Sequence, residues 1–407
     1  MLNASPHRTA TDAEAGLWLT ERLGGAGANY HMPLPVRLRG PLDRARLAAA
    51  CDAVVARHPA LAGRFEERDG APVRLDAQAP RLEAGGDPDA AIREPFDLTT
   101  GPLCRFTLHE QGPDEHLLLV VAHHLVFDGM SKDILLRDLA AAYRGEPLDA
   151  PAAGAQEQPP AEPDTAAAEA FWKERDARLD EVVLLGRTIV APARPEPAGS
   201  ATVDLSRAAE APDRAAVSRF EATLAALHAV LRAHGNPDAA VAVDMSTRDE
   251  ATADTIGLFV NELPVAAGPA DTFRDLGELL REEMRALRPF RQVPYARAVG
   301  GLRPRAALAP VSLSYRRRIA PPSFDGLGAA VEWAPFLGMV RGVAHLLVVE
   351  GPDGTEAHLR HNTRLLDSAG ARALADALAR LLAEAADNPG APLAAARPPA
   401  PLAGAVP

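Results

Sequence analysis

The segment that most restricts the fold of this chain is a short apolar run that ends in a pair of histidines. Residues Leu117–Ala122 contain no polar alternation and are followed by the loop sequence His-His-Leu-Val-Phe-Asp-Gly at 123–129. A short run of this kind is typical of a strand buried on both faces. Beyond the loop, apolar residues recur at helical spacing as far as Gly145, and Ser131 is a candidate N-cap. The segment therefore predicts a strand, a loop and a helix within an α/β fold.

The same loop offers the groups that acyl or proton transfer needs. An imidazole titrates at about pH 6.5, so His124 could take a proton near neutrality. Gly129 has no Cβ, which lets a substrate approach its N–H closely enough to stabilise an oxyanion. Asp128 could orient an imidazole or hold the loop through an arginine. A bare histidine pair at a strand end is more often structural, but the complete pattern favours a catalytic site.

The loop resembles the His-His-x-x-x-Asp-Gly signature of the condensation domains of nonribosomal peptide synthetases, which belong to a wider acyltransferase superfamily. Further segments resemble other motifs of this family, in the family's order. They are Ala13–Trp18 with Glu14 where glutamine is usual, Ala28–Pro33, Arg57–Leu61, Pro95–Leu98, Gly101–Leu103, Ile256–Asn261 and, loosely, Gln292–Tyr295. The resemblance implies an α/β fold of two chloramphenicol-acetyltransferase-like lobes, arranged as a V around an active-site tunnel.

The resemblance also implies roles for individual residues. His124 is expected to act as general base, or to hold the nucleophile and stabilise the tetrahedral adduct, and Gly129 is expected to contact the oxyanion. Structural roles at the site are implied for His123, Asp128 and Arg248, and substrate binding for Asn261, Ser131 and His345. Asn261 could instead satisfy a carbonyl at a strand end.

The chain departs from the family pattern at several positions. Residues 61–63 read Leu-Ala-Gly where the family commonly has Leu-Arg-Thr, so an arginine often credited with anchoring the loop aspartate is missing. Arg248 and Arg64 are the candidates to replace it, and either could be a surface charge. His345 stands where many relatives have an acidic residue, so it could tune the acceptor pocket or be structural. The tyrosine-rich fourth motif is not evident.

The length of 407 residues and the 47% hydrophobic content are sufficient for two packed cores. A Pro- and Ala-rich stretch at 150–168 is typical of a linker. We therefore expect an N-terminal lobe at 1–165 with the histidine motif and a C-terminal lobe at 166–400 with the Gly-x-Phe-Val-Asn motif. In the second half, periodicity predicts helices at 220–231, 273–287 and 369–386 and strands at 311–315 and 346–349. The Pro-rich composition from residue 392 onward predicts a disordered tail.

The net charge and the cysteine content restrict which partners and ligands are expected. The net charge of -12 argues against nucleic acid. Two arginine groups could meet an acidic carrier protein or its phosphopantetheine phosphate, although solvated surface is the favoured interpretation. These groups are Arg37, Arg39, Arg44 and Arg46, and the run Arg316–Arg318. Cys51 and Cys104 have no metal-site spacing, so we expect two buried thiols and no metal.

The absence of a signal-like N-terminus and of an 18-residue apolar run predicts a cytoplasmic protein without a membrane span. We find no adenylation loop and no Gly-Gly-x-Ser carrier site, and therefore expect a free-standing enzyme that meets its carrier protein in trans. We also expect a monomer. The only cofactor implied is the phosphopantetheine arm of that carrier.

The resemblance implies a condensation enzyme of natural-product biosynthesis. Such an enzyme joins a carrier-bound acyl or aminoacyl thioester to an amine, or to an alcohol, to form an amide or an ester. A thioester is already activated, which fits the absence of a nucleophilic Ser or Cys in the motif. Two alternatives stay open: an acyl-CoA-dependent acyltransferase of the same superfamily, and a non-catalytic carrier-docking module, which the departure at Ala62 motivates.

Overall fold

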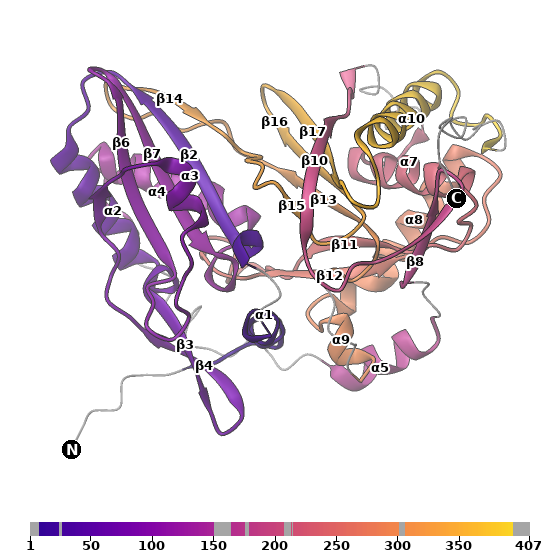
Figure 1. Ribbon diagram of the computed structural model, residues 1–407, viewed down its shortest axis with the longest axis horizontal. Coiled ribbons are helices and arrows are strands. Elements are labelled where there is room, and N and C mark those ends of the chain that lie inside the picture. Colours follow the sequence, from indigo (N-terminus) through magenta and orange to yellow (C-terminus); the bar gives the residue numbers. More distant parts are fainter. Residues whose placement is uncertain are drawn as a thin grey trace.

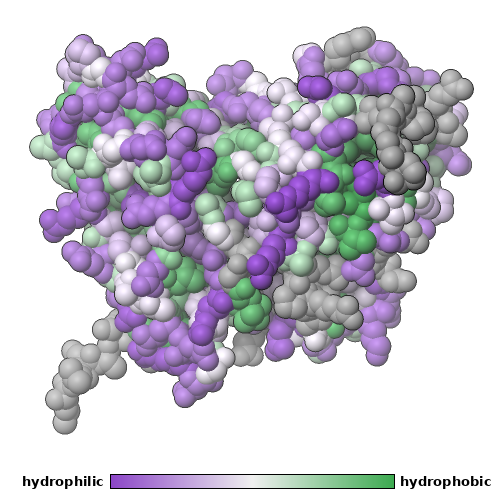
Figure 2. Space-filling model, viewed as in Figure 1, coloured by the Kyte–Doolittle hydropathy of each residue, from purple (hydrophilic) through white to green (hydrophobic). Residues whose placement is uncertain are grey.

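The computed structural model describes residues 8–23, 27–149, 164–175, 179–206, 213, 215–300 and 306–393. Two α/β lobes, each built on its own sheet, meet at one end and diverge at the other, so that the molecule has the shape of a V (Figure 1). The face in Figure 2 carries mainly hydrophilic residues with smaller hydrophobic patches between them. Most of the apolar side chains gather in two cores, one in each lobe.

The sheet of the first lobe has the apolar run at its centre. Its five strands follow the order β14 (Gly328–Val331), β2 (His31–Arg39), β7 (Glu115–His123), β6 (Cys104–Gly112) and β5 (Leu82–Ala84). β7 runs antiparallel to both of its neighbours, and every residue in it after Glu115 is buried. The predicted strand, buried on both faces, is therefore confirmed, and it ends at His123.

Two helices of the first lobe pack against each other and against its sheet. They are α2 (Arg44–Arg57) and α4 (Gly129–Tyr143), whose Leu47, Val54, Leu135 and Leu139 join the core formed with the strands. The remaining elements lie around this unit. They are α1 (Asp12–Arg22), α3 (Pro88–Arg93), the 3₁₀ helices η1 (Gly27–Tyr30) and η2 (Pro59–Ala62), and a small sheet of β1 (Arg8–Thr9), β4 (Ala71–Asp76) and β3 (Gly63–Arg68).

The start of α4 differs from the sequence prediction. Asp128, and not Ser131, is the N-cap, because its backbone is extended and its Oδ1 accepts a hydrogen bond from the Ser131 N–H at 2.8 Å. Ser131 is already inside the first turn. The predicted end is confirmed, since the helix stops at Tyr143 and Gly145 follows with a φ of +81°.

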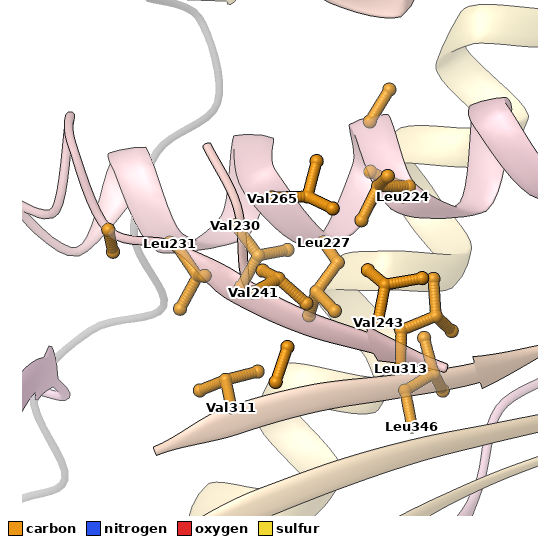
Figure 3. Close-up of a cluster of buried hydrophobic side chains, with 14 of the residues drawn as sticks. Leu224, Leu227, Val230, Leu231, Val241, Val243, Val265, Val311, Leu313 and Leu346 are labelled. Atoms are coloured by element: carbon orange, nitrogen blue, oxygen red, sulfur yellow. The ribbon is translucent and has the colours of Figure 1, made fainter. Parts of the chain in front are cut away.

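The second lobe is built on a seven-stranded sheet. Its order is β12 (Val260–Val265), β11 (Val241–Ser246), β13 (Val311–Arg317), β16 (Ala344–Gly351), β17 (Gly354–Asn362), β10 (Glu196–Thr202) and β15 (Met339–Val340). The helices α7 (Arg219–Ala233), α8 (Phe273–Leu287) and α10 (Ser368–Asp387) lie beside it (Figure 1). Leu227 and Val230 of α7 lie against Val241, Val311 and Leu313 of the strands (Figure 3).

The predicted elements of the second half are confirmed as α7, α8, α10, β13 and β16, and α8 has the predicted bounds. Smaller elements complete the lobe: α5 (Thr165–Lys173), α9 (Tyr295–Ala298), η5 (Arg288–Phe290), and the hairpin of β8 (Glu181–Leu184) and β9 (Arg187–Val190). The linker prediction is wrong for residues 165–168, which begin α5 because Asp164 caps them. Residues 150–163 of that linker, and 394–407 of the predicted tail, lie outside the described residues.

The second half of the chain contributes to the first lobe. Strand β14 pairs antiparallel with β2, and Phe324, Trp333 and Val349 belong to the core of the first lobe. The division of the chain at residue 165 therefore stays a prediction about chain segments, while the packing joins both halves in one sheet.

Candidate active site between the lobes

A cavity of about 710 Å³ lies between the lobes, and residues of both line it. The first lobe contributes His124 and Gly129 from the predicted loop and the start of α4. The second lobe contributes His345 from β16 and residues of β11 and β13. This volume is in the range that holds a small-molecule ligand.

His124 lines this cavity, and a hydrogen bond to the backbone fixes the proton on one of its ring nitrogens. It begins the short 3₁₀ helix η3 (His124–Val126), directly after β7, and its Nδ1 lies 2.8 Å from the Phe127 carbonyl oxygen. A carbonyl can only accept, so Nδ1 carries the proton and Nε2 keeps its lone pair. The backbone therefore fixes the tautomer that a general base requires.

The surroundings of His124 favour its neutral form. Burial lowers the pKa of His124 and the positive charge of Arg341 adds to this effect, while Asp128 and the Phe127 carbonyl act in the opposite direction. A lowered pKa keeps the imidazole unprotonated at neutral pH. The side chain is thus ready to accept a proton.

His123 faces the opposite way and is 1% exposed. Its Nδ1 accepts a hydrogen bond from the Leu125 N–H at 3.1 Å, and its Nε2 lies 3.2 Å from the Glu21 carboxylate of α1. Both nitrogens are used, and neither faces the cavity. This placement fits a structural role, in which His123 holds the turn after β7 against α1.

Asp128 joins the two lobes. Its two carboxylate oxygens both accept from Arg248 Nη2 at 2.9 Å, and Oδ2 also accepts from the Phe259 N–H at 3.0 Å. Arg248 in turn donates to the Thr252 and Thr255 carbonyls. Of the two arginine candidates, Arg248 is therefore the one that contacts Asp128. Arg64 instead contacts Glu66 and the Asp76 and Thr99 carbonyls.

Two residues assigned to substrate binding lie away from the cavity wall. Ser131 is fully buried, and its hydroxyl contacts Asp128, Arg248 and the backbone of Gly257. Asn261 is 6% exposed, and its Nδ2 donates to the Arg291 carbonyl at 2.8 Å. The Ser131 hydroxyl and the Asn261 Nδ2 group are already hydrogen-bonded within the protein, so this placement favours structural roles for both residues.

Gly129 and His345 do line the cavity. The Gly129 carbonyl accepts from Arg316 Nη1 at 2.8 Å. A Cβ on Gly129 would come to 3.3 Å from the Arg316 side chain. His345 Nδ1 lies 2.9 Å from the Ser312 hydroxyl, and burial, together with Arg360 and Arg341, lowers the pKa of His345 to about 3. His345 is therefore a neutral polar group in the wall.

Sequence reasoning missed several charged residues at the site. The interpretation of Arg316–Arg318 as solvated surface is wrong for two of the three: the Arg316 side chain is 13% exposed and pairs with Asp133, and that of Arg318 is 5% exposed. Both guanidinium groups lie against the Trp333 ring, at 5.3 and 5.2 Å from its centre. Three successive arginines carry no local signal of such burial, since their partners come from distant segments.

Tyr30, Arg341 and Asp244 also line the cavity. The Tyr30 ring lies 6.2 Å from that of His124, and Arg341 pairs with Glu262 at 3.2 Å. Glu262 faces Asp244 across the β11–β12 ladder, and burial raises the pKa of both carboxyl groups. The asparagine-tyrosine segment around Tyr30 was recognised only as a motif, without a role.

Comparison with known proteins assigns the chain to a family. Residues 5–315 match the family described as Condensation domain, and the chain belongs to this family. It is 30% identical over 430 residues to the dimodular nonribosomal peptide synthase of Bacillus subtilis. The match covers 93% of this chain but only 18% of that synthase. Condensation domains act with carrier proteins, and they catalyse amide-bond formation except for some non-catalytic members such as X-domains.

Solved structures agree in fold. The X-domain from teicoplanin biosynthesis is 26% identical, with a TM-score of 0.78 over 97% of this chain and 98% of that one. The same domain in complex with OxyB gives 25% and 0.76 over 97% and 96% of the two chains. The condensation domain of the Monacolin K polyketide synthase MokA is 18% identical, with a TM-score of 0.80 over 96% and 100% of the two chains. The predicted architecture of two acetyltransferase-like lobes is confirmed.

Three further findings concern the cysteines, the possibility of a metal site and the possibility of a membrane-spanning helix. Cys51 and Cys104 are both buried and free, as expected. Among the described residues there is no cluster of three or more His, Cys, Asp or Glu side chains that could hold a metal. No helix in the described part of the chain has the length and apolar character needed to cross a bilayer. The free-standing arrangement, the monomeric state and the cytoplasmic location stay predictions.

Proposed function

We propose that this protein is a stand-alone condensation enzyme. It joins an acyl or aminoacyl thioester, carried on the phosphopantetheine arm of a separate carrier protein, to an amine or alcohol. The observation that carries the proposal is His124. Its side chain lines a cavity that both lobes form, and its Nδ1 donates to the Phe127 carbonyl, which leaves the lone pair of Nε2 as the basic site of the ring.

The proposed chemistry needs little else from the protein. The nucleophile attacks the thioester carbonyl carbon, so that the C–N or C–O bond forms in a tetrahedral adduct. His124 Nε2 accepts the proton that the nucleophile loses, or holds the nucleophile and stabilises the adduct. The adduct then collapses by breaking the C–S bond, and that proton passes to the departing sulfur, so that the carrier's arm leaves as a thiol. Gly129, at the N-terminal end of α4, is the proposed oxyanion contact, since first-turn N–H groups of a helix have no partner within it.

Three positioning residues support this arrangement. His123 fixes the turn after β7 through Leu125 and Glu21, and Asp128 with Arg248 holds the start of α4 against the second lobe. We propose that these groups act through His124 and Gly129 and do not touch the substrates. Ser131 and Asn261, first assigned to substrate binding, belong with them.

A non-catalytic docking module is the second candidate. It is favoured by the similarity to the X-domain from teicoplanin biosynthesis, which has been solved in complex with OxyB. The lone pair on Nε2 of His124 and the size of the cavity favour catalysis instead. An acyl-CoA-dependent transferase differs from the first proposal only in the donor that it accepts.

One experiment separates the three candidates. A carrier protein is loaded with an acyl group, an amine is added, and the acyl group is followed by intact-protein mass spectrometry, with the same acyl group on CoA in parallel. We expect loss of the acyl group from the carrier and formation of an amide. His124→Ala should slow this step by about 10²- to 10⁴-fold.

His116→Ala is the matched control, because His116 lies at the other end of the same strand and does not line the cavity. It should leave the rate close to that of the wild type. Equal turnover by His124→Ala would remove this side chain from the mechanism. Turnover of acyl-CoA alone would favour the transferase, and binding of the carrier without turnover of either donor would favour the docking module.

A further inference from the structure

One wall of the cavity contains more cationic than anionic side chains. Lys132 of α4, Arg316 of β13 and Arg360 of β17 all line it. Asp133 pairs with Arg316 at 3.1 Å. Among the residues that the structure describes, Lys132 and Arg360 have no carboxylate within ion-pair distance. Two basic side chains in this wall are therefore without a counter-ion in the part of the chain that the structure describes.

The contacts that Lys132 and Arg360 do make are all to neutral groups. Lys132 is 6% exposed, and its Nζ donates to the Pro33 carbonyl at 2.8 Å. Arg360 Nη2 donates to the Ala334 and Pro335 carbonyls at 3.0 and 2.9 Å, and its Nε is buried without a partner in the described part of the chain. Burial of a cation without a counter-ion is unfavourable, so an anion in the cavity would be stabilised here.

The same conclusion follows from the proton affinity of Lys132. Burial lowers its pKa well below the usual value, and the charges of Arg316 and Arg360 lower it further, while Asp133 and Glu332 act in the opposite direction. The ammonium form of Lys132 is therefore disfavoured by its surroundings. A nearby anion would favour that form, so that anion binding and protonation of Lys132 would support each other.

The position of this wall identifies the part of a substrate that would reach it. Lys132 lies three residues beyond Gly129 on α4, and residues at that spacing are neighbours on one helix face. On the facing sheet, Arg360 is the cross-strand partner of His345, which is the partner of Ser312. All three line the cavity. The cationic wall is thus close to the proposed reaction centre and not remote from it.

We propose that Lys132 and Arg360 form a subsite for a carboxylate carried by one of the two substrates. The proposal rests on the proposed function, because it assigns a chemical class to a substrate of that reaction. The phosphate of the phosphopantetheine arm is another source of anionic oxygens. It lies at the end of the arm remote from the thioester, whereas Lys132 lies one helical turn from Gly129.

Calorimetric titration without turnover tests the proposal. In the donor series, succinyl- and glutaryl-N-acetylcysteamine are compared with their monomethyl esters, in the absence of any amine. In the acceptor series, β-alanine and glutamate are compared with their amides, in the absence of any thioester. Phosphopantetheine alone is the third ligand. Because no turnover is measured, the result does not depend on whether His124 is catalytic.

We expect the carboxylate form to bind about tenfold or more tightly than its neutral analogue in one of the two series, as charge-assisted hydrogen bonds usually provide. Lys132→Met and Arg360→Leu should each reduce this preference. Arg37→Leu, at an exposed arginine of β2 outside the cavity, is the control and should keep it. If Lys132→Met does not fold, Arg360→Leu gives the same test at a half-buried position.

The series that shows the preference identifies the substrate that carries the carboxylate. The proposal is overturned if neither series distinguishes the charged from the neutral form, or if the preference survives both cavity substitutions. It is also overturned if only phosphopantetheine binding depends on Lys132 and Arg360, because the anion would then belong to the carrier arm.

Discussion

Replacement of Arg248 by methionine tests whether the contact between the lobes stabilises the protein and holds the loop that contains His124 in place. The Arg248 and Asp128 side chains are 5% and 4% exposed, and Nη2 lies 2.9 Å from both carboxylate oxygens. The guanidinium also lies 4.5 Å from the centre of the Phe259 ring. Methionine keeps part of the apolar contact with that ring but removes the charge.

The expected loss of stability follows from what remains around Asp128. Removal of one partner of a buried ion pair costs about 3–5 kcal/mol, because a charge is left buried without compensation. Asp128 would keep its hydrogen bonds from the Ser131 N–H, the Ser131 hydroxyl and the Phe259 N–H. We therefore expect a loss near the lower end, about 3 kcal/mol. The turnover number should also fall, since Asp128 caps the helix that begins at Gly129.

Urea unfolding, followed by tryptophan fluorescence, measures the free energy of unfolding. Arg380→Met is the matched control, because Arg380 and Glu384 form an exposed pair one helical turn apart, with side chains 45% and 54% exposed. Its effect should be about 0.5 kcal/mol or less. In a double-mutant cycle, Asp128→Asn should reduce the cost of Arg248→Met by about 1 kcal/mol or more. A loss no larger than that of Arg380→Met, or additive effects in the cycle, would refute the reasoning.

Three further predictions use other parts of the molecule. Burial lowers the pKa of His228 to about 3, so the unfolded chain binds the proton more strongly between about pH 6.5 and 3, and stability should fall as the pH drops through this window. His228→Gln should make urea unfolding less dependent on pH by up to about 1.4 kcal/mol per pH unit, and an unchanged slope would contradict this. Burial raises the pKa of Cys51 to about 12 and that of Cys104 further, so a thiol reagent should label neither in the native protein and both in urea; rapid native labelling would contradict their burial. Phe127→Ala should destabilise the protein by about 3–5 kcal/mol in thermal or urea unfolding, because this ring is fully buried beside the active-site loop, and a loss below 1 kcal/mol would show that the site is not tightly packed.

Local patterns were sufficient for the elements that carry the site. The apolar run from Leu117 predicted β7, and the spacing of apolar residues predicted α8 with its observed bounds. These two predictions succeeded because the faces of a strand or helix that are buried carry apolar residues at a regular spacing in the sequence. The resemblance to condensation domains then ordered these elements into two lobes.

Contacts between distant segments could not be predicted in the same way. Asp128 and Arg248 are 120 positions apart, and the sequence could only offer two arginines as candidates. Ser131 was expected to cap α4, but the helix already begins at Gly129, and the Asp128 carboxylate accepts from the Ser131 N–H, so that Ser131 lies inside the first turn. Lys132 and Arg360 gave no signal at all, since their shared wall exists only when α4 and β17 come together.

The pairing of β14 with β2 sets the order in which the protein can mature on the ribosome. The first lobe's sheet contains residues 31–39 at one side and receives its edge strand only from residues 328–331. During synthesis, the edge of β2 that pairs with β14 therefore stays unpaired while almost three hundred intervening residues are added. An unpaired strand edge invites association with other chains. Slow translation or truncation before residue 331 should consequently favour aggregation of nascent chains. A strand from the second half of the chain thus completes the sheet of the first lobe.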